Sequence, residues 1–131
     1  MKKIPTYFVA LTIIIPLLTI GNTMSTHANA WTLVDSKTAS STSTYLKGVT
    51  GGDAKICLKN QIGGIRVNVY HKDESSSYGA LILNSVFIGN NSCITFDASP
   101  YIDETNNDAQ FVVVTTRTPI SSYTLELWNE K

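Results

Sequence analysis

The sequence after residue 30 predicts an all-β domain: a small two-sheet antiparallel β-sandwich of about eight strands, stapled by one disulfide. Three observations predict this class. Apolar residues come in short runs separated by Gly, Asn and Ser; no long segment has a helical period; and the chain holds two cysteines, Cys57 and Cys93. Short, evenly spaced runs of this kind are typical of sandwiches and small barrels.

Residues 1–30 have the three parts of a secretory signal peptide. Lys2 and Lys3 form the positive start, residues 7–20 form the apolar middle, and Ala28 and Ala30 provide the small residues of an A-x-A end. The apolar run is short for a membrane span of ~20 residues, so no stable membrane anchor is expected after cleavage. We predict cleavage after Ala30, which removes 30 of 131 residues and leaves a single 101-residue domain, 31–131. The expected destination is the medium or cell surface, with the periplasm as an alternative.

The expected strands follow one another in short steps along the mature chain. They are residues 31–34, 45–49, 55–59, 65–72, 80–88, 93–97, 110–117 and 123–129. The Ser/Thr-rich stretch 36–43 predicts an exposed connection or a loose edge, and residues 98–108 predict a polar, acidic loop.

Alternation assigns faces within these strands. Ile65, Val67 and Val69 share one face of their strand, which is the pattern of a half-buried strand. Residues 111–114 are apolar on both faces, so we expect a central strand covered on both sides. A single open sheet could not cover such a strand, and this favours two layers.

Cys57 and Cys93 are 36 residues apart in a chain that is expected to be exported. An even pair in an oxidising compartment predicts a disulfide, which the chain-entropy description values at about 3–4 kcal/mol. If the neighbouring residues Ile56 and Ile94 face the core, both sulfurs lie on the outer face of one sheet. The disulfide would then join two strands of that sheet rather than pin the two sheets together.

Charge excludes one class of partner. Without Lys2 and Lys3, the chain has 8 basic and 10 acidic residues, so there is no basic field to attract nucleic acid.

No residue set predicts catalysis, and we expect that the protein is not an enzyme. The single mature histidine, His71, continues the inward phase of its strand, which predicts a partly buried structural residue. The alternative is a general base for a nearby serine in a small hydrolase, although no Gly-x-Ser-x-Gly motif is present.

No cofactor is expected, apart from one calcium alternative in the acidic loop. Flexible acidic loops can supply the six to eight oxygens that calcium prefers, but the spacing matches no EF-hand. The candidate ligands are Asp97, Asp103, Glu104 and Asp108.

Outward aromatic residues are the third kind of candidate. Strand phase turns Tyr70 and Trp128 away from the core, and Tyr101 lies in a loop. Such rings can stack on sugars or peptides, and the alternative is that neighbouring segments cover them.

Three segments resemble the strand signatures of bacterial pre-peptidase C-terminal domains, which are secreted β-sandwiches appended to exported enzymes. They are residues 52–58, 111–114 and 123–127. Lys55 departs from that pattern, which usually has an acidic residue there. The resemblance implies the sandwich fold.

Together these features predict a secreted, non-catalytic binding module whose partner is an extracellular protein or a surface polymer. The alternative is a secreted antagonist, either a bacteriocin-like toxin or an inhibitor of an extracellular enzyme.

Overall fold

The computed structural model describes residues 30–72, 78–119 and 121–130. From Trp31 on, the chain forms one compact unit. The signal-peptide prediction concerns residues 1–30, which lie almost wholly outside the described residues. The described strands are β1 (Trp31–Ala39), β2 (Ser43–Val49), β3 (Asp53–Lys59), β4 (Ile65–His71), β5 (Leu81–Ile88), β6 (Cys93–Asp97), β7 (Ala109–Thr115) and β8 (Tyr123–Glu130).

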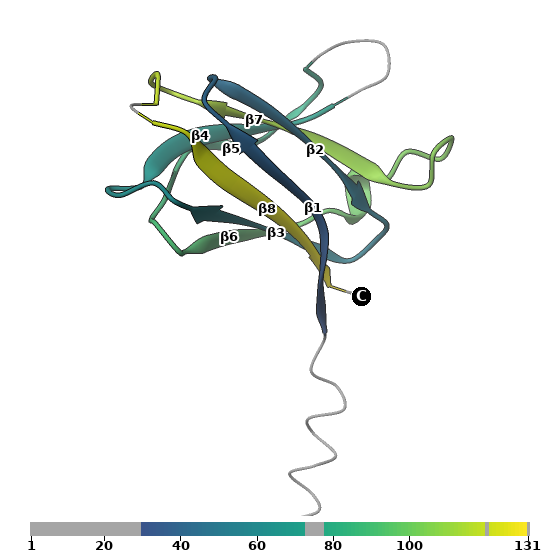
Figure 1. The fold of residues 1–131 in the computed structure, drawn as a ribbon. Helices are drawn as coiled ribbons and strands as arrows, with labels where there is room; N and C mark the ends of the chain where they lie inside the picture. The colour runs from purple at the N-terminus through teal and green to yellow at the C-terminus, as the bar shows by residue number, and fades with distance from the viewer. Residues whose placement is uncertain (1–29, 73–77, 120, 131) are drawn as a thin grey trace, which may run out of the picture. The chain divides into compact units, whose positions relative to one another are not determined.

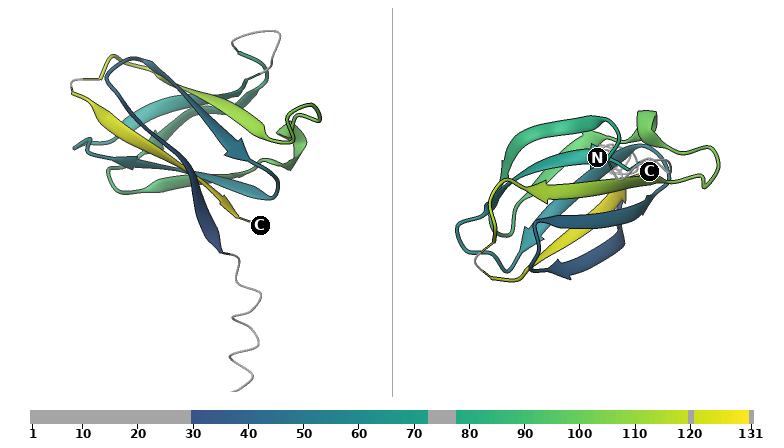
Figure 2. Two further views of the ribbon diagram at one scale, coloured as in Figure 1. Left: turned by 45° about the vertical axis from the view of Figure 1, so that its right-hand side comes forward. Right: turned by 90° about the horizontal axis from the view of Figure 1, so that it is seen from above.

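The strands form two four-stranded antiparallel sheets. The first sheet has the order β1-β8-β3-β6, and the second has the order β2-β7-β4-β5. Figure 1 shows these two layers, and Figure 2 shows them from two further directions. The predicted two-sheet, all-β fold is therefore confirmed. Within the described residues, no helix is long and apolar enough to cross a membrane.

Side chains from both sheets fill the space between them. Phe96 of β6 meets Phe111 of β7 edge to face, with ring centroids 5.1 Å apart. Tyr123 is fully buried, and its hydroxyl donates to the Ser41 carbonyl at 2.9 Å. The other large, fully buried side chains are Leu46, Val49, Ile56, Leu58, Val67, Val69, Ile88, Val113, Leu125 and Leu127.

Two segments differ from the sequence expectation. The first strand does not stop at residue 34 but continues to Ala39, because it pairs with β8 after a bulge between Leu33 and Asp35. It is the edge strand of the first sheet, so the expected loose edge is an ordered one. The expected acidic loop holds a short 3₁₀ helix, η2 (Ser99–Tyr101), and a bridge between Asp103 and Asp108.

Side chains of β1 close the sandwich at its β1 and β2 edges, which lie side by side in Figure 2. Asp35 Oδ2 accepts from the Lys47 amide at 3.0 Å, and Lys37 Nζ donates to the Tyr45 carbonyl at 2.8 Å. These contacts satisfy edge groups of β2 that no strand pairs with. Charged side chains in this position also oppose pairing with a foreign strand.

The disulfide joins Cys57 of β3 to Cys93 of β6, which lie directly opposite each other in the first sheet. Ile56 and Leu58 on either side of Cys57 are fully buried in the core, so the sulfurs lie on the outer face. Both the predicted disulfide and its position within one sheet are confirmed.

Strand β7 is central in the second sheet, between β2 and β4. Phe111, Val112 and Val113 are buried, as the uninterrupted apolar run predicts, whereas Val114 is only partly buried. The register of β7 with β4 sets Thr115 opposite Val67, and the register of β4 with β5 sets Arg66 opposite Phe87. These two registers shape the cleft described below.

Candidate functional site

Trp128 lies on the outer face of the first sheet, as its strand phase predicts, and it is half-buried. Lys55 Nζ lies 4.4 Å from the ring centroid of Trp31 and 5.4 Å from that of Trp128. The Trp128 indole donates to Glu126 Oε1 at 3.2 Å. The ring therefore already has a cation and a carboxylate of its own chain as neighbours.

Tyr70 lies on the outer face of the other sheet. It is half-buried, and its ring stacks on Tyr78 with centroids 5.0 Å apart. Tyr101 belongs to η2 and contacts the ring of His71 at a centroid distance of 5.4 Å. The three predicted aromatic residues therefore occupy separate places and do not form one binding surface.

His71 ends β4 beside Tyr101, as a partly buried residue. Residues 75–77, the serines nearest to it in sequence, lie outside the described residues. The hydrolase alternative rests on those serines and stays a prediction.

The acidic residues of the 97–108 segment are used locally. Asp97 Oδ1 accepts from the Ser99 amide, Asp103 Oδ1 from the Thr105 amide, and Asp108 Oδ1 from the Gln110 side chain. Glu104 is exposed. Across the described residues, no group of three His, Cys, Asp or Glu side chains could hold a metal ion. Calcium binding here stays a prediction, which melting with chelator and with added calcium would test.

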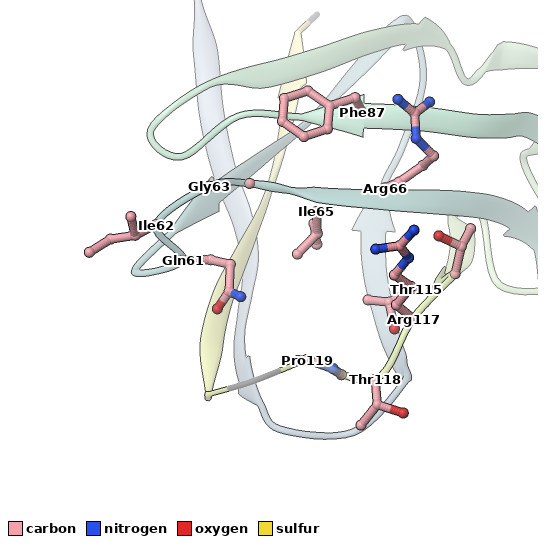
Figure 3. Close-up of a pocket in the computed structure, with 12 residues that line it drawn as sticks. Gln61, Ile62, Gly63, Ile65, Arg66, Phe87, Thr115, Arg117, Thr118 and Pro119 are labelled. Atoms are coloured by element: carbon pink, nitrogen blue, oxygen red, sulfur yellow. The ribbon is translucent and has the colours of Figure 1, made fainter.

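The described residues form a cleft that the sequence did not indicate. We call it the arginine cleft; residues 61–66, Phe87 and residues 115–119 line it, and its volume is about 500 Å³. It lies where the β3–β4 turn, the end of β5 and the segment after β7 meet (Figure 3). Both arginines of the chain, Arg66 and Arg117, belong to its lining.

The two arginines are held differently. Arg66 belongs to β4, the strand between β5 and β7. Its Nη1 donates to the Ser85 carbonyl at 2.7 Å. Its guanidinium also lies over the Phe87 ring, 5.8 Å from the centroid. Arg117 follows β7, and Figure 3 shows its guanidinium directed toward β4. Within the described part of the chain, neither arginine forms an ion pair.

Gly64 allows the apolar wall of the cleft to form. Phe87 is 51% exposed and Ile62 is 94% exposed. Gly64 has a φ of +74°, and a Cβ there would lie 2.6 Å from both the Ile88 carbonyl oxygen and Phe87 Cζ. Only glycine allows the turn to approach β5 this closely. The sequence has Gly63 and Gly64 side by side just before the strand expected at 65–72, but it does not show that Gly64 approaches Phe87.

Residues 21–127 match a family model described as the YndA coiled coil domain. The match covers most of the chain, which therefore belongs to this family. A coiled coil needs helices with a heptad repeat, whereas the described residues within the match form β-strands and one 3₁₀ turn. The fold of this member is thus a β-sandwich, and the family is not the one that the three strand segments resemble. No curated protein matches the chain.

Proposed function

We propose that this protein is an exported, non-catalytic binding module and that the arginine cleft is its recognition site. The observation that carries the proposal is the meeting of both arginines in one cleft without an acidic partner in the described residues. Arg66 is held by the Ser85 carbonyl and the Phe87 ring, whereas Arg117 has no partner in the described residues and is available for a ligand.

The lining supports binding rather than turnover. It contains threonine hydroxyls but no described His, Asp, Glu, Lys or Cys. A hydroxyl nucleophile needs a neighbouring base, and general acid–base catalysis needs a titratable group near the operating pH. Polar groups that do not titrate near neutral pH can orient a ligand but cannot transfer protons to or from it.

Export is supported by the leader-like residues 1–30 and by the disulfide. Disulfides form and persist in oxidising compartments, so Cys57–Cys93 is compatible with an extracytoplasmic location. The partner is then an extracellular protein or a surface polymer.

A capture experiment tests the recognition site. Oxidised protein purified from culture medium would be incubated with cell-wall polymer, intact cells and culture supernatant, and the retained protein measured.

Arg117→Gln is the test variant, and Lys47→Gln is the matched control because Lys47 is exposed and outside the lining. Both changes remove one positive charge. We expect at least about a tenfold loss of retention for the first and none for the second. Equal retention of the two variants, or no retention of the wild type, would contradict the proposal.

Mass spectrometry of the secreted protein tests export. We expect Trp31 as its first residue. A retained leader in the medium would contradict the processing prediction.

A further inference from the structure

The arginine cleft has a charge opposite to the net charge of the chain after residue 30. The chain after residue 30 has 8 basic and 10 acidic residues, yet the described lining holds two cations and no acid. A charged concavity of one sign raises the local concentration of ligands of the other sign. The ligand chemistry that this cleft favours is therefore anionic.

A buried amide adds a directed donor. Gln61 is only 7% exposed, and its Oε1 accepts from Ser121 Oγ at 3.2 Å. Its Nε2 then has no acceptor in the described parts of the chain, although it can donate two hydrogen bonds. Figure 3 places this side chain in the cleft, near Ile65. A buried donor without an acceptor is costly, which makes it a natural contact for a ligand oxygen.

The guanidinium groups suit a planar anion. The Ser85 carbonyl and the Phe87 ring fix the position of Arg66, while Arg117 has no partner in the described residues. A free guanidinium can bind a carboxylate through two parallel hydrogen bonds. Arg117 is thus the expected direct contact, and Arg66 contributes positive field from the far side of β4.

Part of the remaining lining is apolar. Ile62 and Phe87 are exposed, and Ile65 and Pro119 complete the wall. An inorganic anion would leave this surface in water, whereas a carboxylate that carries an apolar group would cover it.

From these contacts we infer that the arginine cleft binds the C-terminal carboxylate of a peptide that ends in an apolar residue. Arg117 and Gln61 Nε2 hold the carboxylate, and the apolar side chain lies against Ile65 and Pro119, which Figure 3 shows on the same side of β4 as Arg117. This inference rests on the proposed function, since it names the ligand class of the same site.

The test compares two probes that differ only in the charged group. Binding of N-acetylphenylalanine and of N-acetylphenylalanine amide to the purified, oxidised protein would be followed by NMR titration. We expect the acid to bind with a dissociation constant on the order of 1 mM and the amide at least about tenfold more weakly.

Variants assign the binding to the cleft. Arg117→Gln should lose at least about tenfold in affinity for the acid, Arg117→Lys should lose less, and Lys47→Gln should not change. Equal binding of acid and amide, or equal affinities of the Arg117→Gln and Lys47→Gln variants, would overturn the inference. Inorganic phosphate that binds as well as the acid would also overturn it, because the apolar group would then contribute nothing.

The two proposals can fail separately. Retention in the capture experiment together with failure of the acid to bind would sink the ligand class and keep the binding module. Binding of the acid without any retention would keep the ligand class and sink the surface-binding function.

Discussion

Two regions of this protein place cations against aromatic rings, and they differ in what is left unsatisfied. On the outer face of the first sheet, Lys55 Nζ lies close to the rings of both Trp31 and Trp128, and the Trp128 indole has Glu126 as its acceptor. In the arginine cleft, Arg66 lies over Phe87, but Arg117 has no partner in the described residues. In the first region these groups have partners within the chain, which indicates a structural role. The second keeps a cation and a buried donor available, which is what a binding site requires.

The largest expected effect concerns the disulfide of the first sheet. Reducing Cys57–Cys93, or replacing both residues by Ala, should lower the free energy of unfolding by about 3–4 kcal/mol, because the unfolded chain regains the freedom of a long loop. Urea unfolding with and without reductant measures this. The reduced protein, where it is still folded, should bind N-acetylphenylalanine as before. If the reduced protein is fully folded but no longer binds N-acetylphenylalanine, the two regions do not act independently.

Trp128→Ala comes next. The ring is half-buried and packs on Lys55, so we expect a loss of about 1–2 kcal/mol, less than the cost of deleting a fully buried aromatic side chain. Leu81→Ala, at an exposed position of β5, is the control and should cost about 0.5 kcal/mol or less. Thermal unfolding compares the two variants. A negligible loss for Trp128→Ala, together with weaker capture, would make this ring part of the recognition surface.

Arg117→Gln should change stability by less than about 0.5 kcal/mol, since its guanidinium forms no hydrogen bond, ion pair or ring contact with a described residue. Its expected defect lies in carboxylate binding alone. A clear drop in melting temperature would show that the residue supports the fold, and the contrast with Trp128 would disappear.

The smallest effect concerns Tyr45, whose ring lies in a third region with cations nearby: Lys37 Nζ and Lys72 Nζ lie 5.5 and 5.4 Å from its centroid. Burial raises the pKa of Tyr45 above its usual 10.0, and the carboxylates of Asp108 and Asp35 raise it further. The folded state then holds this proton more tightly than the unfolded state. The resulting stability is complete below pH 10 and is lost as pH rises from there toward the folded-state pKa. Stability measured from pH 9 to 11 should fall less steeply in Tyr45→Phe. Parallel curves would show that Tyr45 does not contribute.

Much of the fold could be read from local pattern. All eight strands were expected within a few residues, apart from the continuation of β1 to Ala39. That continuation depends on β8 as a partner and on the bulge after Leu33, which no local pattern shows. The candidate site was not predicted. Arg66 and Arg117 are 51 positions apart in sequence, and each taken alone looks like an ordinary exposed cation.

The sequence by itself determined which faces its strands present. It turned the sulfurs of Cys57 and Cys93 outward on one sheet, and it set Trp128 and Tyr70 on strand faces that point away from the core. Alternation along a strand determines this because it is a local property with a period of two. Only the tertiary structure decided which outward residues meet. It put Trp128 and Tyr70 on different sheets, placed Lys55 beside both tryptophans, and brought both arginines to one cleft. The physical reason is that long-range packing of the core sets strand pairing and register. Pairing and register in turn determine which residues from distant parts of the sequence become neighbours.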